Sequence, residues 1–218
     1  MNVLFLGAPG SGKGTQCKRL ALSYRLPHIS TGDIFREEIA KKSQIGEKVA
    51  EYVNGGRLVP DDLVVEVVSE RLAQGDCSGG FFLDGFPRTV AQALALGAHL
   101  AREKREIDRV LYLELSEKDV VARLSSRRTC EKCGKIYNLV SQPPQAPGFC
   151  DVEGGALFQR EDDSPETIKK RLKVFCETVE PLLAHYRNAG ILETLDGNIS
   201  VDEVTQTAAA VLGRVLSR

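Results

Sequence analysis

The stretch Gly7-Ala8-Pro9-Gly10-Ser11-Gly12-Lys13-Gly14-Thr15 determines the fold that we predict for this chain. It follows the apolar run 3–6 and precedes apolar residues at helical spacing, so it connects a buried strand to a helix. A glycine-rich loop at a helix start binds phosphate, because backbone N–H groups and the helix dipole both favour an anion there. Lys13 would reach the outer phosphates. We therefore predict a phosphate-binding loop, with a plain strand-to-helix turn as the simpler alternative.

One position of this loop departs from the general pattern G-x-x-x-x-G-K-[ST]. Gly14 stands where the pattern has a hydroxyl side chain, and Thr15 follows one residue later. We expect the Thr15 hydroxyl to lie near a Mg²⁺ ion that accompanies the bound phosphates.

Composition narrows the possible partners. The 218 residues carry a formal net charge of −1, so the total charge gives no indication of a nucleic-acid or anionic membrane partner. No apolar run is long enough to cross a bilayer, and residues 1–6 lack the basic start of a signal peptide. We expect a cytoplasmic protein of one domain, or of one domain with insertions.

Apolar strand patterns alternate with helical patterns along the chain, which is typical of an α/β fold with a doubly wound parallel sheet. Residues 30–59 form a small helical excursion from this alternation, whereas residues 129–163 contain prolines, glycines and little periodicity. An irregular segment of that length is uncommon in a compact domain, so we expect it to have a function of its own. The predicted five-stranded sheet uses residues 3–6, 26–29, 81–83, 110–115 and 191–195.

The strand 81–83 ends in Asp84-Gly85-Phe86-Pro87-Arg88, ahead of a helix that carries Gln92. Ligands of doubly wound sheets bind beyond the carboxyl ends of the strands, so we expect Asp84 beside the phosphate loop. We predict that its carboxylate holds Mg²⁺-bound water. The alternative is a simple N-cap for the following helix.

Three of the six cysteines have the spacing of a metal site. Cys130 and Cys133 form a C-x-x-C-G turn, Cys150 begins a second turn, and Glu153 stands where a fourth cysteine would complete it. Because the segment has few apolar residues, a structural metal would supply stability that burial cannot. Unmetallated thiols in a flexible loop are the alternative. The other cysteines are isolated, and we expect them to be small packed side chains: Cys17, Cys77 and Cys176.

The sequence contains no nucleophile next to a general base, and its histidines are isolated. Phosphoryl transfer needs neither, because positioning, Mg²⁺ and cationic side chains stabilise its transition state. Arginines occur on the phosphate-loop side and in the two units that could close over it, and such closure would exclude water. These arginines are Arg36, Arg88, Arg123, Arg127, Arg160 and Arg171.

Together these stretches resemble the signature sequences of adenylate kinases. The most specific is Asp84-Gly85-Phe86-Pro87-Arg88, and the others occur in the family's order over nearly the full chain. The cysteine-bearing segment is similar to the long, metal-bearing lid of bacterial members. The further matching stretches are 7–16, 30–33, 56–60, Arg123 with Arg127-Arg128, Arg160-x-Asp162-Asp163, and Arg171.

The resemblance implies a reversible, Mg²⁺-dependent transfer, ATP + AMP = 2 ADP, which maintains adenine nucleotide homeostasis. It also implies three units: a core of residues 1–29, 60–125 and 164–218, an AMP-binding insertion at 30–59, and a lid at 126–163. The partners would be the small molecules ATP, AMP and ADP. We expect a monomer, since the sequence has no long coiled-coil heptad.

Matched position by position, the resemblance assigns a role to each candidate residue. The catalytic set would be Lys13, Asp84, Arg88, Arg123, Arg127, Arg160 and Arg171. ATP would be bound by Gly10, Ser11, Gly12, Lys13, Gly14, Thr15, Arg127, Ile136, Tyr137 and Ile199. AMP would be bound by Thr31, Arg36, Arg57, Leu58, Val59, Gly85, Phe86, Pro87, Arg88, Gln92, Arg160 and Arg171. A structural Zn²⁺ in the lid would be bound by Cys130, Cys133, Cys150 and Glu153, where family members commonly have Cys or Asp at the last position.

Gln92 also has a physical argument of its own. A carboxamide pairs with the donor and the acceptor on one edge of adenine at once, which discriminates against other bases.

Two other functions fit parts of this pattern. One is another nucleoside monophosphate kinase, or one that takes GTP as donor, but Gln92 and Thr31 favour AMP as acceptor. The other is a zinc-ribbon binding module that uses nucleotide as a switch and exposes residues 130–153 to a protein partner. Such a switch has no need of a second, acceptor-side set of arginines.

Overall fold

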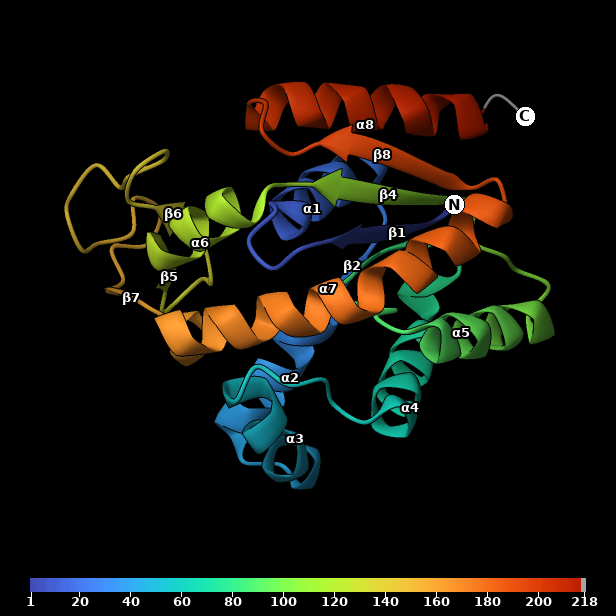
Figure 1. Cartoon of the computed structure of the whole chain (residues 1–218), viewed down its shortest axis with the longest axis horizontal. Coiled ribbons are helices and arrows are strands. Elements are labelled where there is room, and N and C mark those ends of the chain that lie inside the picture. Colours follow the sequence, from blue (N-terminus) through green and yellow to red (C-terminus); the bar gives the residue numbers. More distant parts are fainter. Residues whose placement is uncertain (217–218) are drawn as a thin grey trace.

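A five-stranded, all-parallel sheet forms the centre of the computed structural model, which describes residues 1–216. Its strand order is β2-β3-β1-β4-β8. Helices cover both faces of this sheet (Figure 1), so the predicted doubly wound α/β fold is confirmed. The strands are β1 (Asn2–Gly7), β2 (His28–Ser30), β3 (Phe81–Asp84), β4 (Arg109–Glu114) and β8 (Leu192–Asp196).

Alternating side chains of β1 enter two separate apolar cores. Val3 and Phe5 pack with α1 (Lys13–Tyr24) and α8 (Val201–Leu216) on one face. Leu4 and Leu6 pack on the other face, with apolar residues of α4 (Asp61–Leu72), α5 (Val90–Arg102) and α7 (Pro165–Asn188). None of these four β1 side chains is more than 5% exposed. The loop after β1 therefore begins from a strand that is buried on both faces and cannot shift easily.

Serine side chains begin several helices, as their positions in the sequence predict. Ser30, Ser116 and Ser164 each accept a hydrogen bond from the backbone N–H three residues later. They begin α2 (Thr31–Lys41), α6 (Glu117–Ser125) and α7.

Two further helices begin at a serine and at a proline. Ser43 caps the helix α3 (Gln44–Asn54) by accepting from the Gly46 N–H. Pro60 is the N-cap of α4.

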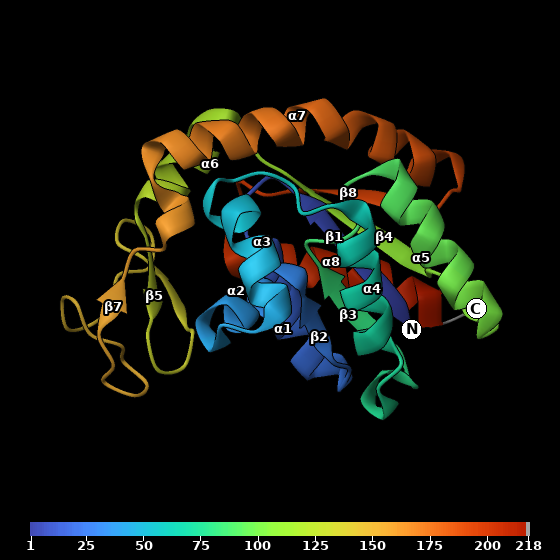
Figure 2. The same cartoon turned by 90° about the horizontal axis from the view of Figure 1, so that it is seen from below.

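The lid segment, residues 126–163, holds a second sheet that the sequence did not predict. This antiparallel sheet has the order β6-β5-β7, with β5 (Arg127–Cys130), β6 (Ile136–Asn138) and β7 (Leu157–Phe158). Its strands are too short for an alternating pattern to be recognised in the sequence. Figures 1 and 2 place it at one end of the molecule, beyond α6 and the first turn of α7.

Two short 3₁₀ helices complete the fold, η1 (Gly75–Cys77) before β3 and η2 (Glu161–Asp163) before α7. None of the helices within residues 1–216 has both the length and the apolar character needed to cross a lipid bilayer.

The isolated cysteines divide into two kinds. Cys17 and Cys77 are fully buried, as predicted. The prediction is wrong for Cys176, which is exposed on α7 and lies 3.6 Å from a Glu117 carboxylate oxygen.

Candidate active site

The phosphate loop forms a compact turn between β1 and α1. Gly10 and Gly12 have φ angles of 78° and 96°, a backbone conformation that favours glycine. The Lys13 ammonium donates to the Ala8 carbonyl oxygen at 3.2 Å, so it lies back over the loop. The buried Ser11 hydroxyl has no hydrogen-bond partner within residues 1–216. The loop thus holds a cation at the N-terminus of α1 and a buried hydroxyl without a partner.

The environment of Lys13 disfavours its own charge. Desolvation lowers the Lys13 pKa to about 8, although the Asp84 carboxylate opposes this shift, and the nearby charges of Arg88 and Arg171 lower it further. A bound phosphate anion would offset the cost of desolvating the Lys13 ammonium and its repulsion from the arginines, because it supplies the opposite charge that this cluster of cations lacks.

Asp84 lies at the carboxyl end of β3, directly beside α1. A Cβ added to Gly14 would lie 2.9 Å from Asp84 Oδ2, so a larger residue there would require the carboxylate to shift. The N-cap alternative for Asp84 is excluded, because Thr89 caps α5 by accepting from the Gln92 N–H.

The Asp84 carboxylate has unused acceptor capacity. Its Oδ1 is buried and has no hydrogen-bond partner among the described residues. Its neighbour His28, which the sequence did not predict to lie here, has its Nε2 3.8 Å from Asp84 Oδ2. A buried carboxylate oxygen is normally satisfied, so this oxygen fits a metal-bound water or a cation.

Two adjoining cavities lie between the sheet, α7 and the segment 30–59. One has a volume of about 80 Å³ and includes Lys13, Gly7 and Pro87 in its lining; of the predicted ATP set, only Lys13 lines it. The other has a volume of about 70 Å³. Arg88 and Arg171 line both, so two cationic side chains stand at the boundary between the cavities. From the predicted AMP set, the second cavity brings together Thr31, Arg36, Arg57, Leu58, Val59, Gly85, Arg88, Gln92 and Arg171.

Arg88 is held by the turn that follows β3. Its Nε donates to the Gly85 carbonyl oxygen at 2.8 Å. Desolvation and the charge of Arg171 lower the Arg88 pKa to about 10, so it remains a cation at neutral pH. Phe86, which the sequence also placed in the AMP set, is buried in the core and lines neither cavity.

Two adjacent carboxylates of η2, Asp162 and Asp163, accept hydrogen bonds from arginines on the lid side of the site. Arg127 donates to both oxygens of Asp163, at 2.7 and 2.6 Å, and Arg171 donates to Asp162 at 2.9 Å and to Asp163 at 3.3 Å. Burial acts to raise the Asp162 pKa, but the charges of Arg171 and Arg36 outweigh it and lower that pKa. Both aspartates belong to the motif Arg160-x-Asp162-Asp163, for which no role of the carboxylates was predicted.

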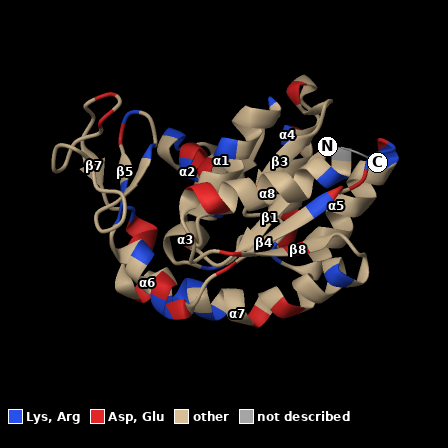
Figure 3. Cartoon of the chain, turned by 90° about the horizontal axis from the view of Figure 1, so that it is seen from above, with Lys and Arg blue, Asp and Glu red and all other residues tan. Residues whose placement is uncertain are grey.

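The remaining predicted arginines connect other parts of the site. Arg123 donates to the Ser11 carbonyl at 3.3 Å and to the Gly197 carbonyl at 2.7 Å, so it joins the phosphate loop to the loop after β8. That second loop carries the partly exposed Ile199. Arg160 donates to Thr129 Oγ1 at 3.0 Å, and desolvation together with the charge of Arg36 lowers its pKa to about 10. Figure 3 shows basic and acidic segments along α6 and the first part of α7, beside the lid.

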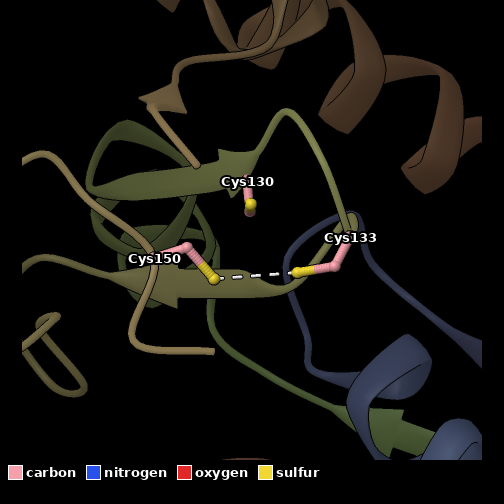
Figure 4. Close-up of side chains that lie close together, drawn as sticks. All are labelled: Cys130, Cys133 and Cys150. Carbon is pink, nitrogen blue, oxygen red and sulfur yellow. Dashed lines mark hydrogen bonds between the residues drawn. The ribbon is translucent and has the colours of Figure 1, made fainter. Parts of the chain in front are cut away.

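The sulfur atoms of Cys130, Cys133 and Cys150 converge in the lid (Figure 4), all within 4.8 Å of one another. The Sγ atoms of Cys133 and Cys150 are 3.7 Å apart. Tetrahedral zinc with Zn–S bonds of about 2.3 Å separates its sulfurs by about 3.8 Å, so this group could hold a metal. The Glu153 carboxylate does not belong to the group, and its ligation stays a prediction.

Tyr137 supports this cysteine group from inside the lid. Its hydroxyl lies 3.3 Å from Cys150 Sγ and accepts from the Asp151 N–H at 2.8 Å. The contact with Tyr137 lowers the Cys150 pKa to about 6, which favours the thiolate that binds metals. Tyr137 is therefore buried in the lid, whereas its neighbour Ile136 is half-buried.

The two cysteine turns share one hydrogen-bond pattern. The Gly134 N–H donates to the Cys130 carbonyl at 3.1 Å, and the Gly154 N–H donates to the Cys150 carbonyl at 2.8 Å. Glu153 therefore occupies, in the second turn, the position that Cys133 occupies in the first.

The chain is similar to known proteins over nearly its full length. The family model described as adenylate kinase matches residues 5–191. An adenylate kinase of Fervidobacterium nodosum is 50% identical over 213 residues, which cover 98% of this chain and 98% of that protein. One from Thermosipho africanus is 49% identical over 214 residues, 98% of this chain and all of that protein. One from Archaeoglobus fulgidus is 46% identical over 217 residues and covers both chains fully.

Proposed function

The chain belongs to the adenylate kinase family, and on this premise we propose how its residues perform the reaction ATP + AMP = 2 ADP. It is a phosphotransferase whose substrates are ATP, AMP and ADP. The observation that carries the proposal is the position of Arg88 and Arg171, which stand at the boundary between the cavity that Lys13 lines and the cavity that the predicted AMP set lines. A phosphoryl group that passes between two nucleotides needs cations at such a boundary, because its transition state spreads negative charge over the equatorial oxygens.

On the donor side, the phosphate loop binds the ATP phosphates. The backbone of residues 10–15 cradles them, Ser11 uses its free hydroxyl, and Lys13 neutralises their outer charge. Arg123 and Arg127 complete the cationic side of the donor phosphates, and the backbone at Ile136, Tyr137 and Ile199 contacts the adenosine. The unpartnered Ser11 hydroxyl and the unfavourable electrostatics at Lys13 support this assignment.

Mg²⁺ enters with the nucleotide in this family. The residues present fit the ion: Asp84 offers a buried, unpartnered oxygen beside the phosphate loop, and Thr15 offers a hydroxyl in the first turn of α1. The ion would neutralise charge on the donor phosphates when bound. Asp84 would accept hydrogen bonds from water bound to the ion, and Lys13 and the arginines would hold the phosphates.

On the acceptor side, AMP occupies the second cavity. Arg36, Arg88 and Arg171 bind its phosphate, and Arg160 joins them from the lid. Thr31, Gln92 and the backbone at 57–59 and 85–87 bind the adenosine. The excess of arginines over carboxylates in this cavity supports an anionic occupant.

The lid completes the site from above the phosphates. We propose that Cys130, Cys133, Cys150 and Glu153 bind a structural Zn²⁺, with Glu153 as the fourth ligand because its turn repeats the hydrogen bonds of the first. The lid (126–163) and the AMP-binding insertion (30–59) would close over the core and exclude water, which otherwise competes with AMP for the phosphoryl group. We further propose a cytoplasmic monomer.

The test is phosphoryl transfer from Mg·ATP to AMP, CMP, UMP and GMP in parallel, with a control that contains no acceptor. We expect rapid ADP formation with AMP and no ADP formation in the control without acceptor. The same panel with Mg·GTP examines the donor. Equal hydrolysis with and without acceptor would overturn the closed two-substrate site and favour a nucleotide-dependent switch module.

A further inference from the structure

The carboxamide of Gln92 is held on both sides by groups outside its own side chain. Its Nε2 donates to Asp61 Oδ1 at 2.6 Å, and its Oε1 accepts from the Arg88 backbone N–H at 2.7 Å. Gln92 is 1% exposed and lines the second cavity. Asp61 belongs to the first turn of α4, far from Gln92 in the sequence, and the sequence analysis gave it no role.

These two contacts fix which end of the carboxamide is which. An ionised carboxylate only accepts hydrogen bonds, so Asp61 requires the NH₂ end of Gln92. A backbone N–H only donates, so Arg88 requires the carbonyl end. A turn of the carboxamide by 180° would place donor against donor and acceptor against acceptor. One N–H and one lone pair of Gln92 remain free for a ligand in a single arrangement.

A glutamine without such partners does not discriminate well between purines. On its Watson–Crick edge adenine presents the N6 donor beside the N1 acceptor, while guanine presents the O6 acceptor beside the N1 donor. A freely turning carboxamide pairs with either edge, because turning exchanges its donor and its acceptor. A carboxamide fixed in the arrangement that suits adenine meets guanine with two mismatched contacts.

Asp61 is itself held in place. Its Oδ2 accepts from the Thr89 hydroxyl at 3.0 Å, and the same hydroxyl accepts from the Gln92 backbone N–H at 3.1 Å. The first turn of α4 and the first turn of α5 are therefore joined through Asp61, Thr89 and Gln92. No lysine or arginine within the described residues pairs with Asp61, so both its oxygens serve this network.

We propose that Asp61 is a positioning residue that sets acceptor specificity: it fixes the orientation of the Gln92 carboxamide so that the acceptor cavity selects adenine over guanine. This inference rests on the proposed placement of AMP in the second cavity. Asp61 touches no substrate in this account and acts through Gln92 alone.

A purely structural role for Asp61 makes a different prediction. Thr89 and Gln92 also resemble a helix-capping pair, in which the N-cap hydroxyl and the side chain three residues later satisfy free N–H groups. If Asp61 merely supported that cap, its loss would lower stability and reduce activity with every acceptor alike. Positioning instead changes the ratio between acceptors.

The decisive measurement compares kcat/KM for AMP with kcat/KM for GMP in wild type, Asp61→Asn and Asp61→Glu, together with their thermal unfolding. Asparagine is nearly isosteric but can donate as well as accept, so it permits the turned carboxamide. We expect Asp61→Asn to raise the KM for AMP, to leave kcat within about twofold, and to reduce the AMP/GMP preference about tenfold. Asp61→Glu keeps an acceptor-only group and should retain most of the preference.

Two further variants serve as controls. Asp62→Asn makes the same charge change at the exposed neighbouring residue and should leave the preference unchanged. In a Gln92→Ala background, Asp61→Asn should have no additional effect on the preference, because the residue through which it acts is gone.

Each outcome has a distinct meaning. An unchanged AMP/GMP preference in folded Asp61→Asn overturns the positioning role, as does an equal loss with both acceptors. If Asp61→Asn does not fold, a preference in Asp61→Glu that equals that of Gln92→Ala overturns it. Failure of the wild type itself to phosphorylate AMP would contradict the proposed function, which is a separate result.

Discussion

The core and the lid place cationic side chains in one site, but different forces hold them. In the core, Lys13 follows a strand whose side chains are buried in two large apolar clusters. In the lid, the apolar cluster consists of Cys130, Tyr137 and Cys150 with Leu157 packed against it. Lid side chains such as Val140 and Val152 are 82% and 64% exposed. Burial therefore holds the core in place, whereas the lid has little apolar burial and three convergent sulfur atoms that could hold a metal.

This difference means that the two halves of the site can be disturbed separately. A change in the phosphate loop should remove catalysis and leave both regions folded. A change in the cysteine group should unfold the lid and leave the core intact, since the five-stranded sheet and the lid sheet share no strand.

Lys13→Met gives the largest expected effect and tests the core half alone. We expect the transfer rate to fall at least about 10³-fold, because a preorganised charge beside the transferred group is lost. Thermal unfolding should be unchanged or slightly higher in temperature, since the variant removes a desolvated cation. Lys18→Met, on the exposed face of the same helix, is the matched control. A residual rate above a tenth of the wild-type rate would contradict the role of Lys13.

Cys150→Ser tests the lid half and should produce the next largest effect. We expect loss of bound metal, faster proteolysis within residues 139–149, and a rate lower by about 10- to 100-fold, with little change in core unfolding. Metal content by mass spectrometry and limited proteolysis measure this. Cys176→Ser, at an exposed cysteine on α7, should change neither. If Cys150→Ser keeps its lid protected from protease, packing rather than sulfur ligation holds the lid.

Arg88→Ala separates the two cavities within the core. We expect the KM for AMP to rise about 30-fold, because a charge-assisted contact to the acceptor phosphate is lost, while the KM for ATP stays within about twofold. Arg102→Ala removes an exposed arginine at the C-terminal end of α5, the helix that follows the turn of Arg88, and should alter neither constant. An equal rise in both constants would show that Arg88 serves the whole site and not the acceptor.

The pH dependence of ATP binding is the smallest expected effect, and it is caused by the titration of Lys13. Its pKa of about 8 means that the free protein loses this charge as pH rises above 8. Bound phosphate favours the protonated form, so affinity should be about fourfold weaker at pH 8.5 than at pH 7, with proton uptake on binding. Calorimetry in two buffers of different ionisation enthalpy measures that uptake. The dependence should be absent in Lys13→Met.

The same pKa shift has a defined sign for stability. Below pH 8 Lys13 is charged in the folded and unfolded states, and the cost of its desolvation is fully present. Between pH 8 and 10.5 the unfolded chain binds more protons than the folded one. The destabilisation caused by Lys13 therefore decreases, and the free energy of unfolding rises with pH in this range.

Local patterns in the sequence predicted most of the fold. The phosphate loop, the five strands and the capping serines each follow from neighbouring residues, because strand burial and helix capping depend on spacing within a few positions. The strands of the lid were missed, since two- to four-residue strands carry no periodic signal. The exposure of Cys176 was also missed, because an isolated cysteine does not indicate on which side of its helix it lies.

The candidate site, like the fold, has features that the sequence predicts and features that depend on tertiary contacts. The sequence by itself determined the chemistry: a phosphate loop, an arginine set, an aspartate at a strand end and a cysteine group, because each is encoded by residue type and short spacing. Only the tertiary structure decided which partners constrain them. Three contacts join elements that lie far apart in the chain. The Asp84 carboxylate lies beside Gly14, and Asp61 accepts a hydrogen bond from Gln92. Asp162 and Asp163 form ion pairs with arginines. A hydrogen bond or a steric collision depends on atoms within a few ångströms, and such distances arise only when strands and helices have packed.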